Sequence, residues 1–212
     1  ITEELSQQGI EVKIGRHKKT SVPKNATRVI CTPATPQDSV ELKEARRRGI
    51  PIQTYPEALG ELTKKYQTIT VSGAHGKSTT TALVSLVLEE GYFDPTVVIG
   101  VKLREFGGSN FRRGRGPYLV IEADEWNRSF LNYSPEHAIV TNIDREHIDT
   151  YGTLDAIEAT FAEYLAKVPP HGTIVANADN PIIANVARKF GEKVVWYSLR
   201  DPEAQLIKPI LK

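Results

Sequence analysis

The stretch that decides the fold is Val71-Ser72-Gly73-Ala74-His75-Gly76-Lys77-Ser78-Thr79-Thr80-Thr81, which follows a β-branched run and opens a helical pattern. Its two glycines let the backbone turn tightly and bring N–H groups close to an anion. A helix that begins near Lys77 directs its unpaired N–H groups and the positive end of its dipole to the same place. We therefore expect a phosphate-binding loop between a strand and a helix.

The polar side chains of this loop suit a nucleotide with a bound metal ion. The ammonium of Lys77 can reach the β- and γ-phosphates, and the hydroxyl of Ser78 can ligate Mg²⁺. The longer form of the motif, G-x-x-x-x-G-K-[ST], needs a glycine where this chain has Val71, so a chance lysine after a glycine turn is the alternative. The strand–loop–helix context favours the phosphate loop. The predicted ATP-binding residues are Gly73, Ala74, His75, Gly76, Lys77, Ser78 and Thr79.

Short apolar runs alternate with helical patterns along the rest of the chain. Runs with little polar alternation are typical of parallel strands covered on both faces, so we expect an α/β fold with a mainly parallel sheet. The predicted strands are Arg28–Cys31, Thr68–Ser72, Thr96–Gly100, Tyr118–Glu122, His137–Asn142, Thr173–Asn177 and Val194–Ser198. The predicted helices are Val40–Arg48, Lys77–Glu90, Thr153–Val168 and Pro181–Phe190.

Two further motifs lie at predicted strand ends, where open α/β sheets place their ligands. Glu122-Ala123-Asp124-Glu125 ends one strand, and Thr141-Asn142-Ile143-Asp144-Arg145-Glu146-His147-Ile148-Asp149 follows another. Mg²⁺ prefers oxygen ligands, so Glu122 is a candidate metal ligand beside bound phosphates. His147 is a candidate for a second metal or for phosphate, although a lone histidine is more often structural.

Composition excludes several classes of protein. The 212 residues carry a net charge of +1, which gives no argument for nucleic acid as a partner. The single cysteine, Cys31, excludes an intrachain disulfide and is expected to be a buried strand-end residue. No apolar run approaches the roughly 20 residues that span a membrane, and Ile1–Leu5 does not look like a signal peptide. We expect a cytoplasmic protein. The oligomeric state stays open.

Two regions of the chain are harder to assign. The polar stretch Leu62–Gln67 suggests a domain boundary, placed between residues 65 and 66. The basic run Arg112-Arg113-Gly114-Arg115 is expected to be an exposed loop before a strand, with anion contact as the alternative.

Taken together, these motifs resemble the Mur ligases of peptidoglycan synthesis. The resemblance rests on the loop Gly73–Thr79, the Glu-Ala-Asp-Glu run and the Thr-Asn-Ile-Asp run with His147 and Asp149. It extends upstream to Cys31-Thr32-Pro33-Ala34 and Arg48-Gly49-Ile50-Pro51-Ile52. It implies that residues 1–65 end a Rossmann-like UDP-sugar-binding domain, and that residues 66–212 form an incomplete P-loop-type central ATPase domain. We expect a fragment without the family's C-terminal amino-acid-binding domain.

The resemblance also implies an activity. ATP would phosphorylate the carboxylate of UDP-N-acetylmuramate, and the amine of L-alanine would attack the acyl phosphate to form an amide. Lys77 and His147 would be catalytic, and Ser78, Glu122 and His147 would hold Mg²⁺. His75 and Asn110 would contact the sugar substrate. This chain alone is expected to complete no ligation.

Departures from the family pattern leave alternatives open. Ser78 stands where threonine is usual, and Trp126 stands where serine or tyrosine is usual. A bulky aromatic residue there also occurs in the ligase that joins recycled tripeptide to UDP-N-acetylmuramate, which is the nearest alternative. A P-loop NTPase switch is the alternative from another class. A third is a nucleotide-binding module without catalysis.

Overall fold

The computed structural model describes residues 2–144 and 151–200. The chain divides into two compact units, Ile1–Ala58 and Leu59–Lys212. No helix in the described ranges is both long enough and apolar enough to cross a membrane.

The first unit is small. Its elements are α1 (Thr2–Gln7), η1 (Lys19–Ser21), β1 (Val29–Cys31), α2 (Val40–Arg47), β2 (Ile52–Thr54) and the beginning of α3 (Tyr55–Thr63). Strand β1 pairs in parallel with β2, a three-residue strand that the sequence analysis did not predict. The hydroxyl of Ser39 caps α2 by accepting a hydrogen bond from the Leu42 N–H at 3.2 Å. Cys31 ends β1 as expected, but it is half-buried rather than buried.

The second unit is built on a seven-stranded sheet in the order β5-β4-β6-β3-β7-β8-β9. All neighbouring strands are parallel except β4 and β5. This confirms the predicted mainly parallel α/β fold. The strands are β3 (Gln67–Ser72), β4 (Thr96–Leu103), β5 (Ser109–Arg112), β6 (Tyr118–Glu122), β7 (His137–Val140), β8 (Thr173–Asn177) and β9 (Val194–Tyr197).

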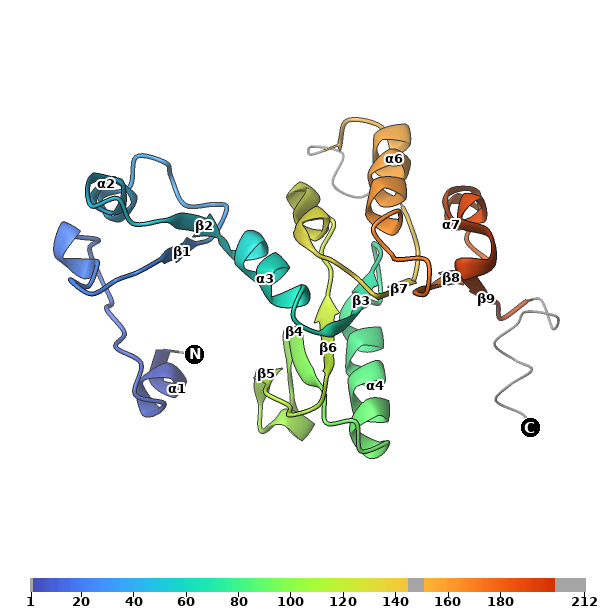
Figure 1. Ribbon diagram of the computed structural model, residues 1–212, viewed down its shortest axis with the longest axis horizontal. Coiled ribbons are helices and arrows are strands. Elements are labelled where there is room, and N and C mark those ends of the chain that lie inside the picture. The colour runs from blue at the N-terminus through green and yellow to red at the C-terminus, as the bar shows by residue number, and fades with distance from the viewer. Residues whose placement is uncertain (1, 145–150, 201–212) are drawn as a thin grey trace. The chain divides into compact units, whose positions relative to one another are not determined.

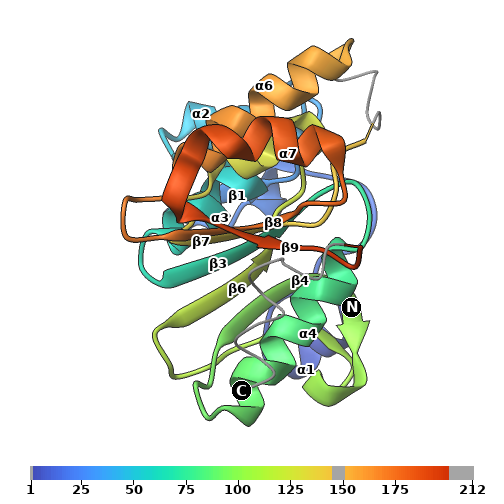
Figure 2. The same cartoon turned by 90° about the vertical axis from the view of Figure 1, so that its right-hand side faces the viewer.

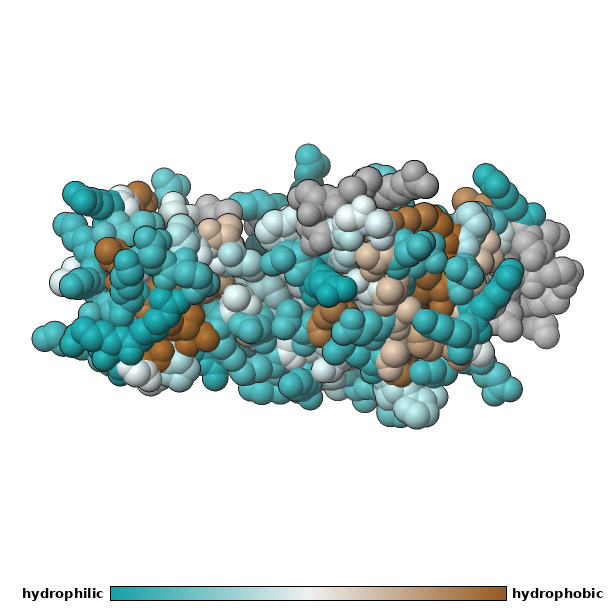
Figure 3. All heavy atoms as spheres, turned by 90° about the horizontal axis from the view of Figure 1, so that it is seen from above, coloured by the Kyte–Doolittle hydropathy of each residue, from teal (hydrophilic) through white to brown (hydrophobic). Residues whose placement is uncertain are grey.

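Helices lie on both faces of this sheet. Helices α6 and α7 lie over one face, and α4 lies against the other (Figures 1 and 2). Besides the end of α3, the helical segments are α4 (Lys77–Glu90), η2 (Arg104–Phe106), η3 (Trp126–Asn132), α6 (Leu154–Leu165), α7 (Pro181–Ala187) and η4 (Arg188–Lys193). The face seen from above is mainly hydrophilic with smaller apolar areas (Figure 3), as expected for amphipathic helices that bury their apolar sides.

The main core lies between the sheet and the helices on the α6 side. Phe130, Phe161 and Tyr164 are fully or almost fully buried there. The rings of Phe130 and Tyr164 stack with centroids 4.4 Å apart, and Phe161 meets Phe130 edge to face at 5.1 Å. A smaller core of Val97, Ile99 and Val120 lies under α4. These cores fix the strand ends that carry the site.

The prediction of an exposed loop before a strand is confirmed for Arg113 and Arg115, but it is wrong for Arg112. Arg112 belongs to the edge strand β5 instead of an exposed loop, and its side chain is only 22% exposed. Its guanidinium pairs with Glu89 at 3.0 Å and with Asp94 at 2.8 Å. The two carboxylates draw the arginine onto the sheet, so Arg112 acts as a structural ion pair.

Candidate functional site

The phosphate loop connects β3 to α4, as the sequence predicts. Gly73 has a φ of 129°, a conformation that other residues rarely adopt, and a β-carbon there would lie 2.3 Å from the Thr141 hydroxyl. Gly76 has a φ of 79° and precedes the first residue of α4. Both glycines are therefore required by the backbone, and Gly73 also by a close approach.

The segment after β7, Thr141 and Asn142, is hydrogen-bonded to the backbone of this loop. The Asn142 carbonyl accepts from the Ala74 N–H at 3.0 Å, and its side-chain amide exchanges hydrogen bonds with the His75 backbone at 2.7 and 2.8 Å. The Thr141 hydroxyl donates to the His75 carbonyl at 2.7 Å. Sequence reasoning noted this motif but assigned no role to Thr141 or Asn142. Their polar side chains directly after a buried strand were the available signal.

Lys77 is held at the mouth of the loop. Its ammonium donates to the Gly73 carbonyl at 2.7 Å and to the Ala74 carbonyl at 3.3 Å. It also contacts both carboxylate oxygens of Glu125 at 3.0 and 3.1 Å. Sequence reasoning named Glu125 only as part of a run and missed this pairing.

Ser78 and Glu122 form the second polar pair of the site. The Ser78 hydroxyl donates to one oxygen of Glu122 at 3.0 Å, and the other oxygen accepts from the Gly100 N–H at 2.8 Å. A β-carbon on Gly100 would lie 3.0 Å from that second oxygen, so the glycine allows this approach. The two oxygen groups predicted to ligate Mg²⁺ are thus in direct contact.

The electrostatics of the site reflect its burial. Burial raises the pKa of the Glu125 carboxyl, and the nearby Lys77 ammonium opposes that rise. The Tyr151 hydroxyl donates to the Glu125 backbone carbonyl, and burial raises the pKa of Tyr151 to about 12. This corner of the site is therefore shielded from water.

The other predicted residues are distributed as follows. His75 and Thr79 are exposed on the loop and the first turn of α4, and Asn110 is exposed on the edge strand β5. The structure thus brings together the loop, Lys77, Ser78 and Glu122. His147 and Asp149 lie outside the described residues.

These features define a class. The chain contains a P-loop α/β domain, in which a glycine loop after a central parallel strand presents backbone N–H groups, an ammonium and a hydroxyl at a helix N-terminus. The family model described as "Mur ligase middle domain" matches residues 71–210, and the one described as "Mur ligase family, catalytic domain" matches residues 1–67. The chain belongs to the Mur ligase family.

Individual relatives support this assignment. A protein of Pelotomaculum thermopropionicum, named UDP-N-acetylmuramate–L-alanine ligase, is 43% identical over 180 residues, which cover 85% of this chain and 39% of that protein. The solved UDP-N-acetylmuramate–alanine ligase of Thermotoga maritima has a TM-score of 0.81 at 27% identity and covers 94% of this chain. This chain spans 44% of that structure, so it corresponds to less than half of either relative.

A third relative is similar in fold alone. The solved UDP-N-acetylmuramate:L-alanyl-γ-D-glutamyl-meso-diaminopimelate ligase of Neisseria meningitides also has a TM-score of 0.81, at 24% identity. The match covers 93% of this chain and 65% of that one. This chain is therefore equally similar in fold to two solved proteins whose names give different acceptors.

Proposed function

We propose that this chain is part of an ATP-dependent ligase that joins L-alanine to the carboxylate of UDP-N-acetylmuramate. The observation that carries the proposal is the polar cluster at the phosphate loop, where Lys77 donates to the Gly73 carbonyl and Ser78 donates to the Glu122 carboxylate at the end of β6. The choice of L-alanine follows the name of the relative that is 43% identical.

The reaction asks the protein for positioning and charge neutralisation, not for a covalent nucleophile. The N–H groups at the N-terminus of α4 and the ammonium of Lys77 bind the phosphates of ATP and neutralise charge on the phosphoryl group as it moves to the substrate carboxylate. The amine of L-alanine then attacks the acyl phosphate, and loss of phosphate leaves an amide. His75 and Asn110 stay predictions for the sugar substrate, as does His147 for catalysis.

The residues also fit a magnesium ion. The Ser78 hydroxyl and the Glu122 carboxylate lie 3.0 Å apart beside the loop, and both are oxygen ligands of the kind Mg²⁺ prefers. The ion, when bound, would neutralise charge between the β- and γ-phosphates. Gly100 keeps Glu122 turned toward Ser78 through its N–H.

The domain assignment belongs to the same proposal. Residues 1–65 would be the last part of a UDP-sugar-binding domain, and residues 66–212 part of the central ATP-binding domain. The family models meet between residues 67 and 71, whereas the contact division lies between Ala58 and Leu59, inside α3. A cytoplasmic location stays a prediction.

The test uses the full-length protein that contains this chain. Phosphate release is measured with ATP, Mg²⁺ and UDP-N-acetylmuramate, while L-alanine, glycine, L-serine or the tripeptide is added one at a time. Release that requires both L-alanine and Lys77, with Lys77→Ala as the control, supports the proposal. Release that ignores every acceptor and the sugar nucleotide contradicts it and indicates a plain NTPase.

The second candidate function is ligation of tripeptide to UDP-N-acetylmuramate. The observation in its favour is the equal TM-score of 0.81 with the two solved ligases. Trp126, which directly follows Glu125 and is 39% exposed, is the bulky aromatic residue by which the chain also resembles the tripeptide ligase. In the same assay, phosphate release that occurs with the tripeptide but with none of the other acceptors would establish this second function.

A further inference from the structure

The ion pair between Lys77 and Glu125 joins two parts of the chain that lie 48 positions apart. The side chain of Lys77 is 14% exposed and that of Glu125 is 4% exposed, so both charges are largely removed from water. Replacing such a buried pair by apolar residues is often neutral or stabilising. Stability alone is therefore a weak reason for a carboxylate at this position.

The backbone next to Glu125 is held in a costly conformation. Asn127 and Arg128 have φ values of 51° and 57°, in the left-handed region that residues other than glycine seldom adopt. The turn is secured by the Glu125 carbonyl, which accepts from the Arg128 N–H at 2.9 Å and from the Tyr151 hydroxyl. Strain of this kind persists where the surrounding structure over-determines it, often at functional sites.

The pair has a direct consequence for the loop. Four acceptors surround the Lys77 ammonium at 2.7–3.3 Å: the carbonyls of Gly73 and Ala74 and the two oxygens of Glu125. The carbonyls belong to the loop itself, whereas Glu125 approaches from β6 and η3. Glu125 thus fixes the lysine from a second, independent element.

We propose that Glu125 is a positioning residue for Lys77, which holds the ammonium at the mouth of the loop for the transferring phosphoryl group. This role rests on the proposed function. The carboxylate acts in two opposite ways. It repels the phosphates of ATP and so weakens binding, and it restrains Lys77 and so favours the chemical step.

The test is Glu125→Gln in the full-length protein, which keeps the shape of the side chain and removes its charge. We expect kcat to fall on the order of 10- to 100-fold, because misplacing a catalytic group by about 1 Å costs about that much. We expect the Kd of ATP with Mg²⁺, measured by calorimetry, to fall by about threefold or more, because a nearby negative charge is removed. Glu125→Asp, which keeps the charge one methylene further back, should have an intermediate kcat.

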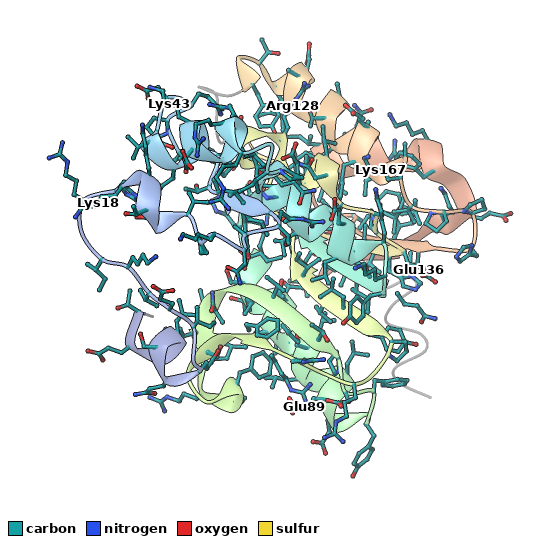
Figure 4. All side chains as sticks on the ribbon, turned by 60° about the vertical axis from the view of Figure 1, so that its left-hand side comes forward. Lys18, Lys43, Glu89, Arg128, Glu136 and Lys167 are labelled. Carbon is teal, nitrogen blue, oxygen red and sulfur yellow. The ribbon has the colours of Figure 1, made fainter. Side chains whose placement is uncertain are left out.

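The matched control is Glu89→Gln, at the other end of α4. Glu89 also pairs with a cation, Arg112, at 3.0 Å, and it lies far from Arg128 in the view of Figure 4. This variant should leave kcat and the Kd of ATP unchanged. An unchanged kcat or an unchanged ATP affinity in Glu125→Gln overturns the proposal and leaves a structural ion pair.

The two proposals fail in different ways. If the wild-type protein releases no phosphate with any acceptor, the proposed ligase function is contradicted. Calorimetry with ATP still reports whether Glu125 opposes the bound phosphates, because it does not depend on ligation. Tighter ATP binding in Glu125→Gln then supports the pairing, and unchanged binding overturns it.

Discussion

Replacement of Gly73 by alanine tests whether the loop is locked to the segment after β7. A β-carbon at Gly73 would lie 2.3 Å from the Thr141 hydroxyl oxygen, 2.7 Å from the Asn142 carbonyl oxygen and 2.9 Å from the Asn142 nitrogen. Two of these three atoms are backbone, so a side-chain rotation cannot relieve the contact. The loop or the segment has to move.

The expected size follows from two contributions. A residue other than glycine at a φ of 129° costs on the order of 1–3 kcal/mol. The steric overlap of the added β-carbon with Thr141 and Asn142 costs about 1–3 kcal/mol more. Gly73→Ala should therefore lower the free energy of unfolding by about 2–6 kcal/mol. Gly76→Ala is the matched control, because Gly76 has a φ of 79° but nothing lies within 4 Å of its added β-carbon. It should cost only about 1–2 kcal/mol.

Urea denaturation followed by tryptophan fluorescence measures both variants. Trp126 and Trp196 both lie in the unit that carries the loop, so the signal reports on that unit. Equal losses in the two glycine variants would refute the reasoning, because they share a positive φ and differ in the contact. Adding Thr141→Ala to Gly73→Ala should not restore stability, because the backbone atoms of Asn142 remain in place.

Two further predictions concern the core and the alkaline limit of stability. Phe130→Ala should lower the free energy of unfolding by about 3–5 kcal/mol in urea denaturation, because the ring is fully buried and stacks on Tyr164. Burial raises the pKa of Tyr151 from 10 to about 12, so its neutral form stabilises the fold below pH 10 and that contribution is lost as the pH rises toward 12. Wild-type stability should fall relative to Tyr151→Phe by at most about 3 kcal/mol over that range. A constant difference between the two proteins would contradict the assignment.

The parts of the fold that could be predicted are those encoded locally. Helix α4 has the predicted bounds Lys77–Glu90, because a glycine precedes it and Gly91 ends it. Strands β6 and β8 also have their predicted bounds, because their apolar runs are flanked by polar or turn residues. The prediction of α6 from Thr153 was close, since the Thr153 hydroxyl caps the helix by accepting from the Ala156 N–H at 3.2 Å.

The parts that were missed depend on distant contacts. Strand β5 ends at Arg112, the first residue of a basic run that looks like a loop, and it forms by antiparallel pairing with β4, where Val97 lies opposite Arg112 and Val98 opposite Phe111. The pairing of Glu125 with Lys77 joins residues 48 positions apart and lies next to a left-handed turn at Asn127 and Arg128. Asparagine tolerates that conformation, but no local preference of arginine predicts it. Strand β5 and the Glu125–Lys77 pair thus depend on contacts between distant parts of the chain, which the local sequence pattern does not reveal.

Strand register determines the chemistry of the site as much as the loop motif does. Strand β3 lies between β6 and β7, and its Val71 pairs with Glu122 on one side and with Ile139 on the other. The loop after β3 therefore receives carboxylates from β6 and its extension, and an amide and a hydroxyl from the end of β7. A slip of β6 by one residue would turn Glu122 to the opposite face of the sheet and separate it from Ser78. The oxygen pair proposed to bind magnesium thus exists only because the apolar residues of β6 are buried in one register.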